Sequence, residues 1–365
     1  MAFPLFACGD SDPSAPDGRE PRPVPMPVLS AIAFSALAAF GSFLVLLQID
    51  IPLLRFLRAL NLSSVQRLGD WGEKLGNGGT LVGISLAIFA LGWFLKRERW
   101  QRVALDSLLA HGAVALVVNG LKHLIGRPRP RLTHGDDWQW WPSWESGMDS
   151  LPSGHTSATV AVVTVLVRGL PRARWLPFVI AAWVAASRIW RGSHFPSDVA
   201  AGMVVGYMTG TVFNAPLKWW YRSAALGLVR IAPVAVAVAG LFWIVSHRVI
   251  DPGTDMLLVG SGLLLVVAGA SIGMLGRRNE GSHRSGLAAR VPLVCLGLGL
   301  GVATGAPVIM VLSLLVCLAW LLEGNQPTEE TVQAVAAWPQ PALYAMGGTA
   351  ALLVIYLVKG LIPLR

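Results

Sequence analysis

Charged residues are scarce in this chain. Asp, Glu, Lys and Arg make up 13% of its 365 residues, hydrophobic residues make up 54%, and the mean hydropathy is +0.59. A soluble globular domain carries roughly 25% charged residues. Apolar runs near 20 residues recur along the chain, and about 20 residues of helix cross the hydrocarbon of a bilayer. The composition therefore excludes an ordinary soluble protein and predicts an integral membrane protein.

Cysteine is also scarce. Three cysteines are too few for a disulfide framework. Cys295 and Cys317 lie in apolar runs, where they are expected to pack. Cys8 follows a short apolar stretch faintly like a lipoprotein cleavage site, but no charged start and apolar segment precede it, so that interpretation is set aside. Residues 1–26 contain six prolines and no periodicity, which predicts a disordered cytoplasmic tail.

The net charge of +9 does not indicate a nucleic-acid partner. Lys and Arg gather in short clusters between the apolar runs, which is the pattern produced by the positive-inside rule. We therefore expect the bilayer, and no nucleic acid, as the partner of these charges.

The apolar runs predict an all-α, polytopic transmembrane helix bundle. A first group of six runs predicts six helices, and a second group adds four or five C-terminal helices, because the run 291–322 fits either a hairpin or one broken span. The predicted organisation is a tail at 1–26, a membrane domain at 27–222 and an accessory transmembrane domain at 223–365. The runs lie at 28–48, 79–95, 103–121, 156–170, 175–187, 199–214, 225–246, 256–275, 291–322 and 341–358.

The basic clusters also predict orientation. They follow alternate spans and would lie in the cytoplasm with the N-terminus: Lys96, Arg97, Arg99 and Arg102; Arg168, Arg172 and Arg174; Lys218 and Arg222. The loops at 122–155 and 188–198 would then both face the periplasm or exterior of a bacterial inner membrane. Residues 49–78 carry several cations on that side and are expected to form an amphipathic piece at the interface.

Three polar clusters stand in these two outer loops. The first runs from Lys122 to Pro130, the second is Pro152-Ser153-Gly154-His155, and the third runs from Ser187 to Asp198. Ionisable groups near membrane depth are costly and tend to be functional. Because all three clusters should meet on one face, we expect them to form one site.

The cations in these clusters suit a phosphate group. Lys122, Arg129 and Arg188 would surround a dianion, with Arg giving bidentate donors and Lys a compact charge. Ser153 and Gly154 would begin a helix, whose free N–H groups bind anions.

Two histidines and a carboxylate complete the predicted chemistry. His194 and Asp198 are four residues apart, so on a helix they would share one face, and the carboxylate would hold one ring nitrogen while the other attacks. His155 would protonate the leaving alkoxide. One imidazole must be neutral and the other protonated, so their environments should push the two pKa values apart.

A zinc site is the competing chemistry, with His155, His194 and Asp198 as ligands. The neighbouring cations would repel a divalent ion, so the sequence favours a site without metal or other cofactor.

The three clusters closely resemble the three-part motif of the type-2 phosphatidic acid phosphatase superfamily. In that motif, Lys, six residues and Arg-Pro are followed by Pro-Ser-Gly-His and then by Ser-Arg, five residues, His, three residues and Asp. Each position has its counterpart here: Lys122, Arg129 and Pro130; Pro152 to His155; Ser187, Arg188, His194 and Asp198. The resemblance covers about residues 28–215.

This resemblance implies metal-independent hydrolysis of a lipid phosphate through a phosphohistidine. His194 would be the nucleophile, Asp198 its partner, and His155 the acid and later the base. The phosphate would be held by Lys122, Arg129, Ser153, Gly154 and Arg188. Phosphatidic acid, phosphatidylglycerol phosphate, undecaprenyl diphosphate and lipid A are candidate substrates.

Two other functions remain open. A lipid phosphotransferase would use the same pocket with a lipid hydroxyl as acceptor, and a phospholipid transporter would bind phosphate without chemistry. A soluble haloperoxidase-like activity fits less well. Residues after 222 depart from the resemblance, and we expect them to pack against the core or against another subunit of a homo-oligomer.

Overall fold

The computed structural model describes residues 26–59, 63–132, 141–169, 175–216, 219–246, 254–278 and 291–322. Within these ranges the chain is helical and has no strand, which confirms the predicted all-α class. Most of the predicted tail at 1–26 and the apolar run at 341–358 lie outside the described residues.

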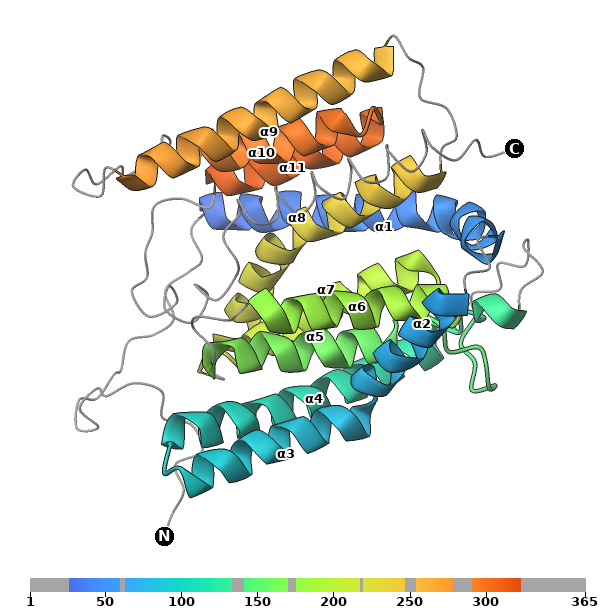
Figure 1. Ribbon diagram of the computed structural model, residues 1–365, viewed down its shortest axis with the longest axis vertical. Helices are drawn as coiled ribbons and strands as arrows, with labels where there is room; N and C mark the ends of the chain where they lie inside the picture. Colours follow the sequence, from blue (N-terminus) through green and yellow to red (C-terminus); the bar gives the residue numbers. More distant parts are fainter. Residues whose placement is uncertain are drawn as a thin grey trace.

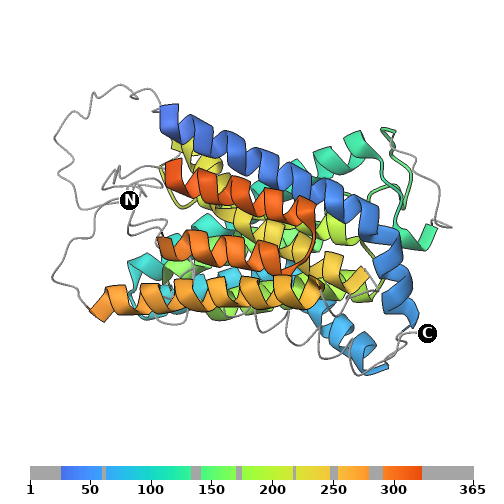
Figure 2. The ribbon, with the colours of Figure 1, turned by 90° about the horizontal axis from the view of Figure 1, so that it is seen from above.

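The helices lie side by side in layers (Figure 1; Figure 2 gives the view from above). The α3–α4 pair is followed by the layer of α5, α6 and α7, then by α1 with α8, and then by α9, α10 and α11. The bounds of the first seven helices are α1 Met26–Ala59, α2 Ser63–Gly76, α3 Gly78–Phe94, α4 Glu98–Ile125, α5 Gly154–Leu166, α6 Trp175–Trp190 and α7 Pro196–Val212. The later helices are α8 Trp220–Ser246, α9 Thr254–Arg278, α10 Val291–Ala303 and α11 Pro307–Leu322. Two short 3-10 turns are η1 Pro130–Leu132 and η2 Val167–Gly169.

Helix α5 is the central element of the first half and packs against α4, α6 and α7. Its contact with α7 depends on glycines spaced four residues apart on α7. A Cβ on Gly202 would lie 2.8 Å from the main-chain oxygen of Ser153, and Gly206 lies against the main chain of Ser157 in the same way. Small residues at this spacing let membrane helices approach closely. The N-terminal ends of α5 and α7 are thereby held together, and both ends carry residues of the predicted site.

Helix α1 is longer than the sequence predicted. Residues 49–59 continue the helix, whereas we expected 49–78 to lie at the interface. The reason is Asp50, which is fully buried and bonds Arg127 inside the bundle, so this turn faces the protein. The interfacial expectation suits α2, which is polar and amphipathic, and which meets α3 at a 58° bend.

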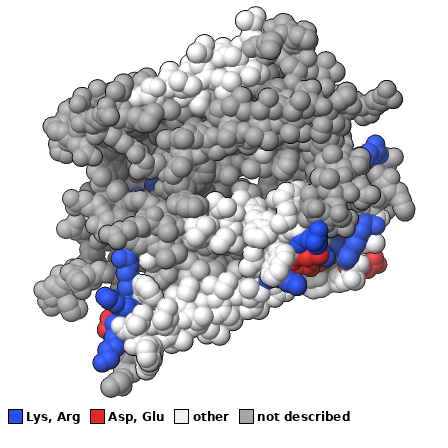
Figure 3. All heavy atoms as spheres, in the orientation of Figure 1, with Lys and Arg blue, Asp and Glu red and all other residues white. Residues whose placement is uncertain are grey.

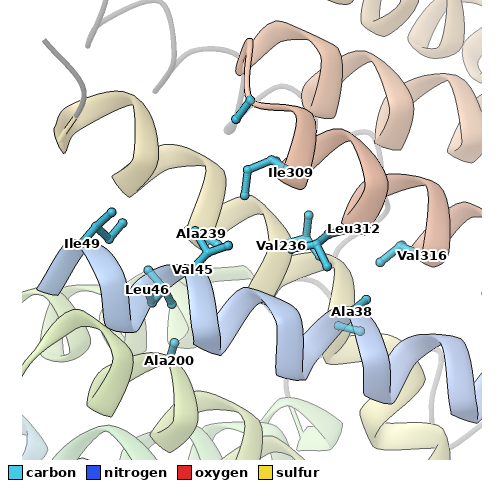
Figure 4. Packing of buried hydrophobic residues seen from close by; sticks show 12 residues of the cluster. Ala38, Val45, Leu46, Ile49, Ala200, Val236, Ala239, Ile309, Leu312 and Val316 are labelled. Carbon is cyan, nitrogen blue, oxygen red and sulfur yellow. The ribbon is translucent and has the colours of Figure 1, made fainter.

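Two of the C-terminal helices, α8 and α11, share a core with α1. Val45, Leu46 and Ile49 of α1 pack with residues of α8 and α11 (Figure 4). The run 291–322 is a hairpin, because α10 and α11 are separate helices joined at residues 304–306 and packed on each other. Of the two interpretations left open by the sequence, the hairpin is therefore correct.

The described surface has the charge distribution of a membrane protein. On the face shown in Figure 3, charged side chains gather at the junction of α3 and α4 and, at the other end, around α2, with an uncharged band between. Three described helices are long and apolar enough to cross a bilayer, and α2 with α3 would form a fourth span if the bent pair counts as one. The basic clusters at 96–102 and 168 lie at one end, where Arg99 donates to the main-chain oxygen of Arg168 and Arg168 pairs with Asp106.

Candidate active site

The C-terminal end of α4 supplies the first cations. The helix ends at Gly126, whose φ of 60° is left-handed, and the Gly126 N–H donates to the Lys122 carbonyl at 2.8 Å. A Cβ on Gly126 would overlap the main chain of Trp141, so glycine is required both for the conformation and for the space. The turn leaves Lys122 on the helix and directs Arg127 and Arg129 into the following loop.

Main-chain hydrogen bonds fix the segment after α4 against residues 143–150. Arg129 N–H donates to the Gly147 carbonyl at 2.9 Å, and Ser150 N–H donates to the Arg127 carbonyl at 2.9 Å. Trp144 also stacks on His123, with ring centroids 4.1 Å apart. The loop is therefore held in place by the main chain and by one aromatic contact, independently of the charged side chains at its centre.

The second cluster begins α5, as predicted. Ser153 is the fully buried N-cap, and its N–H donates to the main-chain oxygen of Asp198 at 3.0 Å. Gly154 lies beside Lys122, because a Cβ there would stand 3.6 Å from the Lys122 Nζ. The first N–H groups of α5 have no acceptor within the helix. Lysine and helix end thus converge on one point.

His194 lies in the turn before α7 and not on the helix that the four-residue spacing suggested. Its Nδ1 lies 2.8 Å from the main-chain oxygen of Ser150 and 3.7 Å from Asp198 Oδ2. A carbonyl oxygen only accepts, so Nδ1 carries the proton and Nε2 of the neutral ring keeps its lone pair. The expected free nitrogen is present, but a carbonyl makes the orienting hydrogen bond that we had assigned to the carboxylate.

Asp198 is committed to other donors. It occupies the first turn of α7, where Oδ2 accepts from the Phe195 N–H at 2.9 Å and from Ser150 Oγ at 2.5 Å. Oδ1 accepts from Arg127 Nη1 at 2.5 Å. A carboxylate at a helix N-terminus is stabilised by the helix dipole. Asp198 therefore holds α7 and Ser150 together, and its charge also acts on His194 from 3.7 Å.

A buried ion network extends from Asp198 to α1. Arg127 bridges Asp198 and Asp50, with Nη2 2.8 Å from Asp50 Oδ2, and all three side chains are at most 3% exposed. Ser197 joins this network by donating its N–H to Asp50 Oδ1 at 3.0 Å. The Arg127 guanidinium also lies over the Phe195 ring, 4.2 Å from the centroid. Arg127 is thus the centre of a scaffold under the histidine.

Arg188 and His155 present polar atoms that lack a hydrogen-bond partner among the described residues. The Arg188 side chain is 4% exposed, yet its Nε and Nη1 make no hydrogen bond there, and neither does the buried Nε2 of His155. The nearest opposite charge is Glu73, 3.8 Å from Arg188. Buried polar atoms are normally satisfied. These atoms are therefore arranged for a ligand with several acceptor oxygens.

This site also contains two carboxylates that were not predicted from the sequence. Asp149 binds Arg129 at 2.7 and 2.6 Å and lies 3.6 Å from Lys122. Glu73 of α2 lies beside Arg188 and binds Arg191 at 2.8 Å. The sequence signal for Asp149 is a carboxylate three residues before Pro152, whereas nothing in the sequence places α2 next to α6.

The eight predicted residues converge. The ring of His155 interacts electrostatically with His194, Arg188, Lys122 and Arg129, although these residues come from separate segments. Burial lowers the pKa of His194 below the usual imidazole value, and the Lys122 and Arg188 charges act in the same direction, while Asp198 opposes them. A lowered pKa favours the neutral ring that a nucleophile needs. Burial and the neighbouring cations also lower the pKa of His155, to about 4, so the two environments do not push the pKa values in opposite directions as the sequence predicted.

A metal does not fit this donor set well. Zinc could take the Nε2 lone pair of His194, but it would also need an oxygen from Asp198, and both Asp198 oxygens already accept other hydrogen bonds. The cations around the histidines would repel the ion as well. The arrangement suits an anion.

Comparisons with known proteins agree with this chemistry. The sequence profile described as the PAP2 superfamily matches residues 103–222. A lipid A 1-phosphatase of Rhizobium etli is 30% identical over 157 residues, which are 40% of this chain and 68% of that protein. A decaprenylphosphoryl-5-phosphoribose phosphatase of Mycobacterium tuberculosis is 32% identical over 127 residues, which are 33% of this chain and 62% of the relative.

Among solved structures, the transmembrane PAP2 type phosphatidylglycerolphosphate phosphatase of Bacillus subtilis has a TM-score of 0.40 and 25% identity, covering 51% of this chain and 93% of that one. Because the identity to the Rhizobium etli protein extends over two thirds of that protein's length, the chain belongs to the PAP2 superfamily.

Proposed function

We propose that the protein is a lipid phosphatase that hydrolyses a phosphomonoester or diphosphate of a membrane lipid through a phosphohistidine on His194. One observation carries the proposal: within the described part of the chain, Arg188 and His155 present buried polar atoms without a hydrogen-bond partner, beside a histidine whose Nε2 is the free nitrogen. A phosphate group has the charge and the several acceptor oxygens that these donors require.

In the first step, Nε2 of His194 attacks phosphorus and the bond to the lipid oxygen breaks. His155 gives the departing alkoxide a proton that it takes up together with the phosphate dianion, because burial and the neighbouring cations otherwise lower its pKa to about 4. Arg188, Lys122, Arg129 and the N–H groups at the start of α5 stabilise the charge on the three equatorial oxygens.

In the second step, His155 takes a proton from water as the water oxygen attacks phosphorus. The nitrogen–phosphorus bond breaks, and inorganic phosphate leaves with its charge balanced by the same cations. His155 is then protonated again and His194 is neutral, so the cycle closes without a cofactor.

The site is proposed to face the periplasm or exterior. The basic residues at 96–102 and Arg168 lie at one end of the bundle, and the positive-inside rule assigns that end to the cytoplasm. The three clusters lie near the other ends of the same helices, so a lipid of the outer leaflet would present its phosphate to them.

The substrate class is a phosphate on a lipid anchor. The relatives named above act on lipids with quite different backbones, a lipid A and a decaprenyl sugar phosphate. What their names share is a phosphate carried by a large apolar group, and this shared part is what the Lys and Arg side chains here can recognise.

The decisive experiment uses the full chain purified in detergent with EDTA present. Phosphatidic acid, phosphatidylglycerol phosphate, undecaprenyl diphosphate and lipid A are offered to wild type and to His194→Ala, and free phosphate is measured. We expect release by wild type and none by the variant. Activity that survives His194→Ala would refute the nucleophile assignment.

The same experiment separates the two alternatives. Phosphate found on an acceptor lipid instead of in solution would indicate phosphotransfer from His194. Binding of all four lipids without turnover would favour a transporter.

A further inference from the structure

The acidic side chain of Asp149 occupies the edge of Arg129 that would best receive a phosphate. Its two oxygens accept from Arg129 Nε at 2.7 Å and Nη2 at 2.6 Å, and one of them lies 3.6 Å from Lys122 Nζ. Carboxylate and phosphate use the same parallel pair of guanidinium donors. A phosphate that takes this edge must therefore displace Asp149 or share the arginine with it.

Asp149 keeps its charge over the whole working range of pH. Burial alone would raise the pKa of Asp149, but the hydrogen bond from Arg129 and the charges of Lys122 and Arg129 outweigh it and hold the pKa at about 2. Glu73 shares Arg188 in a similar way, at 3.8 Å. Two carboxylates thus offset much of the charge of the three cations, and the pocket attracts a bare anion less strongly than those cations alone would.

The loop at Asp149 is also held by hydrogen bonds that do not involve the Asp149 side chain. The neighbouring main chain is fixed by the hydrogen bonds from Arg129 to Gly147 and from Ser150 to Arg127. The Asp149 side chain is itself 29% exposed, against 11% for Lys122. Its carboxylate is therefore free to move aside while the backbone stays in place.

We propose that Asp149 is a specificity-determining residue that competes with the phosphate group for Arg129 and Lys122, and so selects lipid phosphates over soluble ones. This inference rests on the proposed function, since it assumes that the two cations hold the substrate phosphate. A lipid phosphate adds the binding of its anchor in the bilayer and can displace the carboxylate. Inorganic phosphate and small phosphomonoesters lack that contribution, so they bind weakly and the product leaves readily.

The test compares wild type with Asp149→Asn, which keeps the shape of the side chain and removes its charge. Glu145→Gln is the matched control, because Glu145 is an exposed carboxylate of the same loop. Binding of inorganic phosphate to the full chain in detergent is measured by isothermal titration calorimetry with EDTA present. Removing a like charge next to the bound anion should tighten phosphate binding by on the order of tenfold in Asp149→Asn. The control should leave the Kd unchanged.

A second measurement compares kcat/KM for p-nitrophenyl phosphate and for phosphatidic acid. Asp149→Asn should raise the ratio in favour of the soluble ester, and Glu145→Gln should not. Phosphate binding that is unchanged or weaker in Asp149→Asn would overturn the inference and make Asp149 a residue that positions Arg129.

The proposed function fails separately from this inference. If wild type binds no phosphate and releases none from any lipid, the assignment of the pocket is wrong and the competition falls with it. If wild type hydrolyses lipid phosphate but Asp149→Asn shows no tighter binding, only the competition is wrong.

Discussion

The Nδ1 atom of His194 lies 2.8 Å from the main-chain oxygen of Ser150, nearly an ångström closer than the 3.7 Å to Asp198. The orienting group is therefore a backbone carbonyl. Asp198 contributes its charge from 3.7 Å and accepts hydrogen bonds from the Ser150 hydroxyl and from the N–H of Phe195. This differs from a triad in which a carboxylate holds the histidine directly, and the difference can be measured.

Asp198→Asn should lower kcat by roughly 10- to 100-fold, well short of the ~10⁴-fold loss seen when a directly bonded triad carboxylate is replaced. The reason is that the carbonyl of Ser150 still fixes the tautomer of His194. The measurement is single-turnover phosphate release per folded enzyme. Asp106→Asn, which alters an ion pair with Arg168 at the opposite end, is the control and should keep full activity. A loss in Asp198→Asn as complete as that in His194→Ala would contradict the prediction.

The lowered pKa of His194 should appear in the pH dependence of stability. The unfolded chain takes up a proton on this ring below about pH 6.5, whereas burial keeps the folded ring neutral to a lower pH. The stabilisation is thus complete above pH 6.5 and is lost as the pH falls, at up to about 1.4 kcal/mol per pH unit. The test is unfolding of wild type and His194→Gln in detergent between pH 8 and 5, a range that brackets the ordinary imidazole pKa of roughly 6.5. Wild type should lose more stability than the variant on acidification, and the opposite trend would mean a raised pKa.

The network of Asp50, Arg127 and Asp198 should show strong energetic coupling. Arg127→Gln leaves two buried carboxylates without their cation, which typically costs about 3–5 kcal/mol. Asp50→Asn alone should cost less, because the amide can still bond its neighbours. In the double variant one of the stranded charges is gone, so the loss should be smaller than the sum of the two single losses. Thermal unfolding of the four proteins in detergent measures the coupling, and simple additivity would count against a shared network.

The sequence predicted which polar residues converge better than it predicted the scaffold. Lys122, His155 and His194 were expected to lie close together because span ends on one face must meet, and the structure brings them together. Asp50 could not be assigned, since a carboxylate at the end of an apolar run looks interfacial until its partner is known. That partner, Arg127, is 77 residues away in the chain.

The local conformation of the third cluster was also beyond the sequence. Four-residue spacing is compatible with one helical face, but Pro196 begins α7 two residues after His194. Proline favours the first helical position, so the helix starts too late to include the histidine. The Ser150 carbonyl accepts the hydrogen bond from His194 Nδ1 instead. Every residue has a main-chain oxygen, so the residue type at position 150 does not indicate this contact.

The close packing of α5 on α7 should be required for activity as well as for stability. A Cβ on Gly206 would meet the main chain of Ser157, which cannot move as a flexible side chain could. Gly206→Ala should therefore force the two helices apart and destabilise the protein by roughly 1–3 kcal/mol.

Gly112→Ala is the matched control on α4, where a Cβ meets nothing within 4 Å. It should leave the Tm unchanged or slightly higher, because alanine has the better helix propensity. Since His155 lies in the first turn of α5 and Asp198 in the first turn of α7, separation of the helices should also lower kcat. A Gly206→Ala protein with wild-type Tm and kcat would mean that the contact does not position the site.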